Sequence, residues 1–274
     1  MTQLLKIEWL KLKNYRAFIV LSIFFVIGVF ASNYIVYSVM HNMVNQTSAG
    51  AMVGIFNPYS FSGTWQTTSY VTGFLLILPA MLLIISITNE FTFRTSRQNI
   101  IDGWNREQFI SVKLMMAFIA AAACTVLVAI TALVFGATSG TDFSTNGISH
   151  IGFFFIKALT YNIIAVFISV LIRKTGFAIG LYFIYLGAEN IISQILDVVS
   201  LNLRNNENLD LGSIGDYLPM NASDGLLTFP DNPMKSIARS ALPTDYTWLV
   251  MILAAVYLIL FYFLSRKNIL KKDL

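Results

Sequence analysis

Three ionisable side chains interrupt otherwise apolar stretches of this 274-residue sequence: Lys157, Glu189 and Asp197. A charge inside a membrane span is costly, so function is its default explanation, for example an ion or substrate pathway. On a helical wheel, other polar side chains gather on the side that carries Glu189. The complete polar stripe is Tyr182, Glu189, Asn190, Ser193, Gln194 and Asp197. Such a stripe should not face lipid, so we expect it to face a partner subunit, an outer segment of the chain or a translocation path.

The three intramembrane charges lie at different depths. Asp197 is close to the end of its apolar stretch, where a carboxylate has an ordinary interfacial role. Glu189 lies about 14 Å from that end at about 1.5 Å per residue, and both a structural and a transport role stay open for it. Lys157 lies about 9 Å into the preceding stretch by the same rise. We expect its long side chain to extend outward or to contact Glu189.

Metal, nucleophile and nucleotide chemistry have little support in the sequence. His41 and His150 have no cysteine or carboxylate at a ligand spacing, so no metal site is expected. Ser-His-Asp catalysis has no local signature, and no catalytic residue is predicted. The sequence also lacks a G-x-x-x-x-G-K-[ST] phosphate loop. We therefore expect no cofactor in this chain and no ATP hydrolysis by this chain alone.

The composition predicts the elements that must position these side chains. Hydrophobic residues make up 56% of the chain, charged residues make up 12%, and the mean hydropathy is +0.69. Soluble domains carry roughly 25% charge, so the composition excludes disordered, nucleic-acid-binding and disulfide-rich secreted classes. A membrane helix needs about 20 apolar residues. Six stretches are near that length: 17–37, 70–87, 114–137, 151–172, 176–198 and 246–264.

These stretches predict one all-α transmembrane domain over residues 1–274, with six membrane helices. The first stretch is longer than the apolar part of a signal peptide, so we expect it to be retained. Fourteen Lys and Arg residues lie in the termini and alternate connections, whereas the opposite connections hold only Arg204, Lys235 and Arg239. The positive-inside rule then places both termini in the cytoplasm. We expect a multi-pass protein of a bacterial inner membrane.

Two segments outside the spans predict interfacial structure. Residues 1–16 predict a helix that contacts membrane lipids, because five apolar side chains share one side of a wheel: Leu4, Leu5, Trp9, Leu12 and Tyr15. Glu8 lies within that apolar arc and weakens the pattern. Residues 199–245 hold four prolines between short apolar patches: Pro219, Pro230, Pro233 and Pro243. Proline breaks long helices, so we expect short helices that lie at the membrane surface or dip into it.

The inner loop, residues 88–113, has the pattern helix, break, helix. Gly103 is the break, and Asn105 suits the N-cap of a new helix. Gln108, three residues later, completes a capping box. Charge alone favours an ordinary basic cytoplasmic loop, but the order of the residues is more specific than the charge.

That order is Glu90, then Thr95-x-Arg97-Gln98, then Gly103-x-Asn105-Arg106, then Phe109 and Lys113. It resembles the loop after the second span in permease subunits of type-2 ATP-binding-cassette (ABC) exporters. In that family the loop typically contains Glu, Thr-x-Arg-Gln, Gly-x-Ser-Arg-x-x-Phe and a Lys at the next span. Here Asn105 replaces the usual Ser and keeps the capping function. The interfacial helix, the six spans and the large outer segment resemble the same family.

The resemblance implies a membrane subunit that pairs with a second permease, identical or different, and with two ATPase subunits that hold ATP and Mg. The loop would be a coupling helix seated in a cleft of the ATPase. Its charged residues Glu90, Arg97 and Arg106 would set its register there. Closure of the ATPase dimer would rock the spans and move a lipid-like, peptide, drug or polymer substrate outward.

Two other functions stay open. A polytopic membrane enzyme acting on lipid would use Glu189 or Asp197 as an acid or base, although no nucleophile or metal cluster accompanies them. A mechanical subunit would transmit ATPase motion to an envelope partner without transport, and its coupling loop would look the same. Their requirements differ: the enzyme needs no nucleotide, the exporter needs ATP and substrate, and the mechanical subunit needs ATP and an outer partner.

Overall fold

The computed structural model describes residues 2–46, 59–207, 209–230, 244 and 246–271, and within these ranges the regular elements are all helices. Six helical segments are long and apolar enough to cross a membrane. They are α2 (Arg16–Gln46), α4 with α5 (Phe61–Gly73 and Ile77–Thr92), α7 (Arg106–Thr138), α8 (Ser149–Ile172), α9 (Thr175–Glu207) and α12 (Thr247–Lys271). The predicted all-helical fold is confirmed for the described residues, and the six segments agree with a multi-pass membrane protein.

The central helix of the bundle is α8, which packs against α4, α5, α7 and α12. Two thirds of its membrane window is buried, 67%, a larger share than in any other span. Small side chains such as Ala158 and Ala165 are fully buried along it and let the neighbouring helices approach closely. The core therefore consists of α8 and the faces of its neighbours that turn toward it.

The second span is interrupted in its middle. After α4, a single 3-10 turn, η1 (Phe74–Leu76), precedes α5. Pro79 has no N–H to donate to the carbonyl of Leu75, and its ring crowds that carbonyl. A local departure from α-helical geometry one turn before a proline is the expected response.

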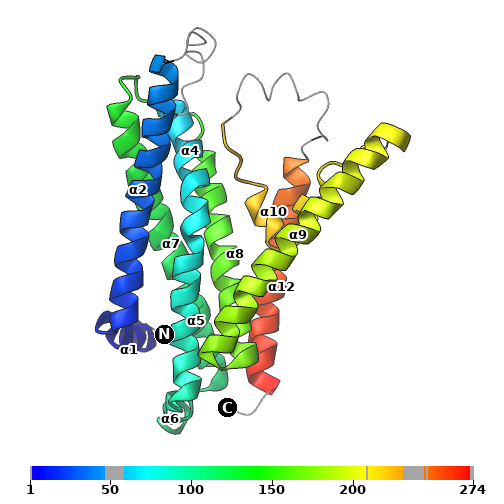
Figure 1. Cartoon of the computed structure of the whole chain (residues 1–274). Coiled ribbons are helices and arrows are strands. Elements are labelled where there is room, and N and C mark those ends of the chain that lie inside the picture. The colour runs from blue at the N-terminus through cyan, green and yellow to red at the C-terminus, as the bar shows by residue number, and fades with distance from the viewer. Residues whose placement is uncertain (1, 47–58, 208, 231–243, 245, 272–274) are drawn as a thin grey trace.

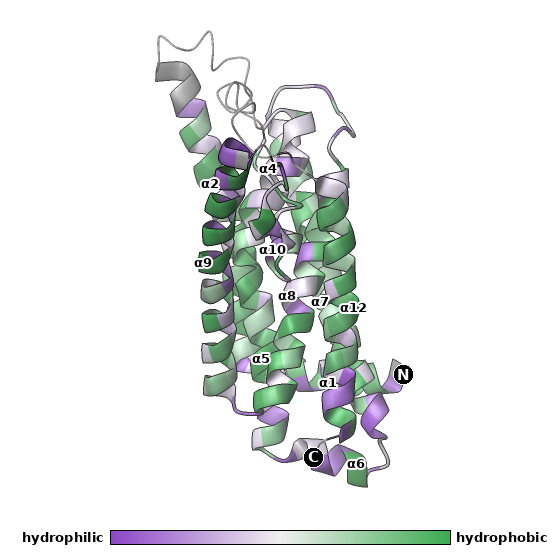
Figure 2. Ribbon diagram, turned by 90° about the vertical axis from the view of Figure 1, so that its right-hand side faces the viewer, coloured by the Kyte–Doolittle hydropathy of each residue, from purple (hydrophilic) through white to green (hydrophobic). Residues whose placement is uncertain are grey.

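One end of the bundle carries both termini together with α1 (Thr2–Lys13) and α6 (Thr95–Ile101) (Figure 1). We call this the basic end, because Arg173 and Lys174 connect α8 to α9 there and Lys271 ends α12. Figure 2 shows hydrophobic residues along the long helices and hydrophilic residues around α1 and α6. This arrangement agrees with the expected topology, while the side of the membrane that each end faces stays a prediction.

The helix α9 diverges from the rest of the bundle, and the outer segment that follows it folds back toward the spans. Away from the basic end, α9 leans away from the other spans (Figure 1). Two short helices follow it and fold back between α8, α9 and α12: η2 (Ile214–Tyr217) and α10 (Asn221–Asp224). Short helices in the outer segment are therefore found as expected, and their burial among the spans shows that this segment dips into the bundle. Pro233 and Pro243 lie outside the described residues.

Candidate functional site

At the tip of the basic end, α6 projects beyond the membrane helices (Figure 1). The chain leaves α5 through Arg94, which adopts a left-handed conformation with φ 58°, and turns directly into α6. After α6, Gly103 has φ 101°, a conformation that favours glycine, and no atom of the described residues lies within 4 Å of the Cβ position. The glycine is therefore required by the backbone reversal, as the sequence pattern predicted, and not by lack of space.

The start of α7 has the predicted capping box. Asn105 is the N-cap, and its backbone N–H donates to Gln108 Oε1 at 3.0 Å. The box satisfies N–H groups that the first turn of a helix would otherwise leave without partners. Gly103 and the cap at Asn105 therefore fix where α6 ends and where the membrane helix α7 begins.

The outer surface of α6 and its flanks combines apolar and cationic side chains. Phe93 is 72% exposed and Ile101 is 77% exposed, next to the exposed side chains of Arg97 and Gln98. Exposed apolar side chains that gather on a polar loop are one mark of a protein interaction site. Arginine beside an apolar anchor is a frequent combination at the centre of protein interfaces.

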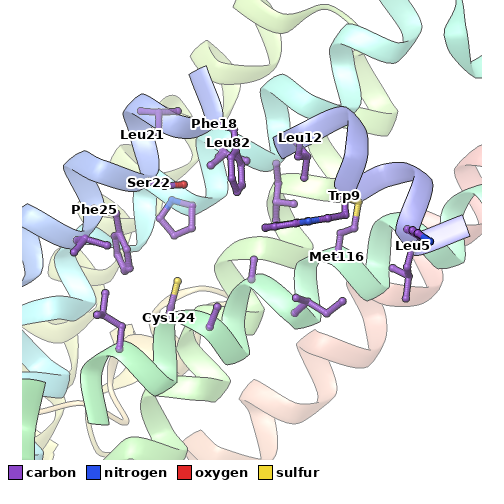
Figure 3. Close-up of a pocket in the computed structure, with 18 residues that line it drawn as sticks. Leu5, Trp9, Leu12, Phe18, Leu21, Ser22, Phe25, Leu82, Met116 and Cys124 are labelled. Carbon is purple, nitrogen blue, oxygen red and sulfur yellow. The ribbon is translucent and has the colours of Figure 1, made fainter. Parts of the chain in front are cut away.

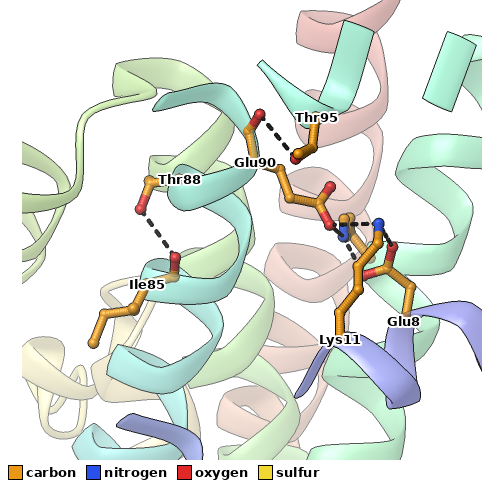
Figure 4. Close-up of polar contacts among 7 residues, drawn as sticks. Glu8, Lys11, Ile85, Thr88, Glu90 and Thr95 are labelled. Atoms are coloured by element: carbon orange, nitrogen blue, oxygen red, sulfur yellow. Dashed lines mark hydrogen bonds and ion pairs between the residues drawn. The ribbon is translucent and has the colours of Figure 1, made fainter. Parts of the chain in front are cut away.

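Behind α6, a cluster of four charges joins three helices (Figure 4). Lys113 of α7 is fully buried, pairs with Glu8 of α1, and lies 2.8 Å from Glu90 Oε1 of α5. Lys11 of α1 bridges the same carboxylates, at 2.9 Å from Glu8 Oε1 and 3.1 Å from Glu90 Oε1. We call these four residues the charge cluster. It attaches the interfacial helix α1 to both helices that carry α6.

Two members of the charge cluster, Glu8 and Lys11, have pKa values shifted toward their ionised forms. Burial raises the pKa of Glu8, but the charges and hydrogen bonds of Lys113 and Lys11 outweigh it and hold that pKa below its ordinary value. Burial likewise lowers the pKa of Lys11, and the carboxylates of Glu90 and Glu8 more than compensate, so the net shift is upward. Both shifts favour the ionised forms of Glu8 and Lys11, and both depend on the partners that these two side chains meet in the cluster.

Besides Lys113, two residues of the loop motif lie inside the protein, Glu90 and Phe109. Glu90 is 6% exposed, so the expectation that it contacts an ATPase directly is wrong for this conformation: it binds Lys113 and Lys11 instead. Its carbonyl accepts a hydrogen bond from Thr95 Oγ1 at 3.4 Å, which ties α5 to the start of α6. Phe109 is fully buried and packs edge-on against Phe91. Both motif residues position α6.

The other arginine of the motif joins the loop to the end of α12. Arg106 is partly buried, and its Nη1 donates to the carbonyl of Leu270 at 3.4 Å. Next to it, Arg266 of α12 lies 3.1 Å from Glu107 of α7. Arg97 remains on the exposed surface of α6. The structure therefore brings α1, α5, α7 and α12 together behind one projecting helix.

The intramembrane charges form a separate group in the opposite half of the bundle. The predicted contact between Lys157 and Glu189 is wrong: Lys157 Nζ lies 3.3 Å from Asp224 Oδ1 on α10. Tyr161 donates a hydrogen bond to Asp224 Oδ2 at 3.0 Å. A Cβ at Gly73 would lie 2.9 Å from Lys157 Nζ, so α4 leaves room for this side chain. Lys157 finds its partner in the outer segment because that segment folds inward.

Glu189 also holds the outer segment, but through backbone groups. Its Oε1 accepts hydrogen bonds from the N–H groups of Met220 and Asn221, the latter at 2.9 Å, at the start of α10. Asn221 Nδ2 donates in return to the carbonyl of Glu189 at 3.3 Å. Tyr182, two turns before Glu189 in the same helix α9, is fully buried. The carboxylate is thus the acceptor that the short helix needs for its first N–H groups.

The rest of the polar stripe divides between two environments. Asp197 accepts a hydrogen bond from the N–H of Gly215 at 3.0 Å, so it too faces the outer segment. Asn190 and Gln194 are exposed, and the side chain of Asn190 donates a hydrogen bond to the carbonyl of Leu186 in its own helix at 3.0 Å. The sequence left three surroundings open for the stripe: a partner subunit, the outer segment or a translocation path. Glu189 and Asp197 contact the outer segment.

Sequence reasoning missed four of the residues that build these groups: Glu8, Lys11, Lys113 as an ion-pair partner, and Asp224. One signal was present, because Glu8 lies on the apolar side of the interfacial helix. A carboxylate on a face that must be buried needs a cation, and Lys113 supplies it. Asp224 gave no such signal, because it lies in a segment expected to be outside. Within the described residues, no three His, Cys, Asp or Glu side chains are placed to hold a metal ion.

The fold and these two groups define a polytopic, all-helical membrane protein with a projecting helix at one end and buried charges in its spans. Residues 51–274 match a family described as "Protein of unknown function (DUF2705)", and the chain belongs to that family. A search of curated proteins finds no match.

Proposed function

We propose that this protein is a permease subunit of an ABC exporter, driven by separate ATPase subunits that bind ATP and Mg. The observation that carries the proposal is α6 with the residues just before it: a short helix with exposed Arg97 and Ile101, preceded by the exposed Phe93, projects between two membrane helices. The order of loop residues that resembles type-2 ABC exporters lies on this same helix and its flanks. A surface of this kind fits a cleft in a partner protein.

The contacts behind α6 supply a route for movement. A force on α6 acts directly on α5 and α7, because the connections are short. Phe93 and Arg94 separate α5 from α6, and residues 102–105 separate α6 from α7. The charge cluster passes the same force to α1 through Glu8 and Lys11. Three helices would then move as one body, which is what rocking of a permease requires.

In this proposal the basic end faces the cytoplasm of a bacterial cell, where ATP and the ATPase subunits are found. A second permease, either another copy or a different chain, would complete the pathway. The exposed apolar side of α9 offers it a surface, with Ile184, Ile191 and Ile195 each more than half exposed. The substrate would be a lipid-like molecule, peptide, drug or polymer that moves outward.

The test is affinity purification of the tagged protein in mild detergent, followed by identification of any ATPase subunit that accompanies it. Charge reversal by Arg97→Glu with Arg106→Glu should release the ATPase. Ile101→Asp should do the same, and since Ile101 is 77% exposed this variant leaves the packing behind α6 intact. The matched control is Lys174→Glu with Lys267→Glu, which reverses two exposed charges at the same end of the bundle but away from α6.

Recovery of an ATPase with the native chain and the control, and its loss in both α6 variants, would support the proposal. If no ATPase accompanies the native chain in several detergents, the exporter assignment fails. If the ATPase remains with both α6 variants, the assignment of α6 as the coupling helix fails. Transport then separates an exporter from a mechanical subunit, because an exporter in vesicles needs only ATP, its ATPase and substrate.

A further inference from the structure

An elongated apolar pocket of about 740 Å³ lies between the interfacial helix and the spans (Figure 3). The helices α1 and α2 form one wall and α7 forms the opposite wall, while α5 contributes Pro79, Leu82 and Leu83. This volume is within the range of about 300 to 1,000 Å³ that is typical of sites for small organic ligands. The pocket is separate from both the charge cluster and the buried pair of Lys157 and Asp224.

The length of the pocket matches one leaflet of a bilayer. Its lining on α7 extends from Met116 to Leu127. Eleven residues of helix span about 16 Å at about 1.5 Å per residue. Half of a hydrocarbon core of about 30 Å is about 15 Å. Because α7 crosses the membrane and Met116 is near its start at the basic end, the pocket extends along the leaflet on that side.

The polarity of the pocket changes from one end to the other. Of its eighteen lining residues only Lys6 is charged, and it lies on α1 at the basic end. Lys13, two turns further along the same face of α1, is exposed like Lys6. At the opposite end the lining is apolar, with Phe25, Val26 and Leu127. A cation at headgroup depth above an apolar channel is complementary to an anionic amphiphile.

We propose that this pocket is a binding site for a membrane lipid with an anionic headgroup. The phosphate would pair with Lys6. The acyl chains would lie against α7 past Met116 and Cys124 (Figure 3). A lipid in this position would also brace α1, which forms one wall of the pocket and carries Glu8 and Lys11 of the charge cluster. The inference does not depend on the proposed exporter function.

The test is native mass spectrometry of the delipidated protein titrated with phosphatidylglycerol or with phosphatidylcholine. We expect one phosphatidylglycerol to bind at least 10-fold more tightly than phosphatidylcholine. Ala123→Trp fills the pocket without a change of charge and should remove this binding, whereas Lys6→Glu should remove the preference for the anionic lipid. The matched controls are Ile130→Trp, at an exposed position of α7 outside the pocket, and Lys267→Glu. Both should bind like the native chain.

A second measurement uses a thiol on the open side of the pocket. Ala123 lines the pocket and is exposed, whereas Cys124, the single cysteine of the chain, is buried. In a Cys124→Ala background, phosphatidylglycerol at saturating concentration should slow the modification of Ala123→Cys by N-ethylmaleimide at least 5-fold, and phosphatidylcholine at the same concentration should not. Equal binding of the two lipids would overturn the headgroup assignment. Unchanged phosphatidylglycerol binding in a folded Ala123→Trp variant, or no protection of the thiol at position 123, would overturn the site itself.

Discussion

At the scale of single residues, Lys113 carries the most consequential contacts in the protein. It is fully buried at the start of a membrane helix and lies between Glu8 and Glu90. A buried ion pair contributes little compared with apolar packing, but removal of one partner leaves an uncompensated charge. The cluster therefore makes the docking of α1 strongly dependent on each of its members.

We predict that Lys113→Met lowers the free energy of unfolding by about 3 to 5 kcal/mol, because Glu8 and Glu90 then share only Lys11. The double variant Glu8→Gln with Lys113→Met should lose less than Lys113→Met alone, since Lys11 and Glu90 still form a balanced pair. The measurement is a double-mutant cycle by thermal unfolding in detergent. It compares the native chain, Glu8→Gln, Lys113→Met and the double variant. Strictly additive losses would show that Glu8 and Lys113 do not interact.

The charge cluster also predicts a pH dependence. The pKa of Glu8 lies below its ordinary value of 4.5, so its stabilising contribution is complete above that pH and is lost as the pH falls through the lowered pKa. The pKa of Lys11 lies above its ordinary value of 10.5, so its contribution is complete below that pH and is lost as the pH rises through the raised pKa.

Docking of α1 should therefore be constant between about pH 4.5 and pH 10.5 and should weaken outside that window. The fluorescence of Trp9, whose ring packs edge-on against Phe18 of α2 at 5.9 Å, is the readout. Glu8→Gln should remove the acid limb of the profile and keep the alkaline limb. An unchanged acid limb in Glu8→Gln would assign that transition to another group.

At the scale of elements, α6 depends on two backbone reversals, and only one of them has a glycine. Gly103→Ala should cost about 1 to 3 kcal/mol, because φ 101° strains any residue with a Cβ even where space is free. Gly180→Ala is the matched control: it is inside α9 with no atom within 4 Å of the new Cβ. It should be neutral or stabilise by up to about 1 kcal/mol.

Hydrogen exchange of residues 95–105, together with thermal unfolding, measures the effect of both glycine variants. Faster exchange in Gly103→Ala and native exchange in Gly180→Ala would agree with the strain argument. Native exchange in Gly103→Ala would mean that the loop accommodates the Cβ by changing its path.

The short helix α10 depends on an acceptor supplied by a membrane helix. Glu189→Ala leaves the N–H groups of Met220 and Asn221 without their carboxylate, at a cost of about 1 to 3 kcal/mol. Glu189→Gln keeps a carbonyl oxygen that can accept both bonds. We expect faster hydrogen exchange over residues 214–227 in Glu189→Ala and a smaller change in Glu189→Gln. Equal and native exchange in both would show that Asp224 and Lys157 hold α10 without Glu189.

At the scale of the whole molecule, the basic end should face the cytoplasm. In a Cys124→Ala background, Asn146→Cys lies in the exposed connection between α7 and α8, and Lys174→Cys lies in the exposed connection between α8 and α9. A membrane-impermeant maleimide should label Asn146→Cys in intact cells and Lys174→Cys only after permeabilisation. The reverse pattern would invert the topology and would place α6 outside, where no ATPase subunit could reach it.

The features that the sequence by itself determined are local ones. A span needs about 20 apolar residues because a helix satisfies its own backbone in lipid, so all six spans could be recognised without knowledge of their neighbours. The N-cap at Asn105 and the reversal at Gly103 likewise depend on residues a few positions apart. These two signals mark the end of α6 and the start of α7, whereas the reversal at Arg94 that starts α6 has no glycine to reveal it in the sequence.

Only the tertiary structure decided the partners of the buried charges. Glu8 and Lys113 are 105 positions apart, and Lys157 meets Asp224 only because the outer segment folds back among α8, α9 and α12. The periodicity of a helix shows which side chains share a face, but it contains no information on which other helix will cover that face. That choice depends on packing across the whole bundle, and it separated Lys157 from Glu189 and placed Glu90 inside the protein.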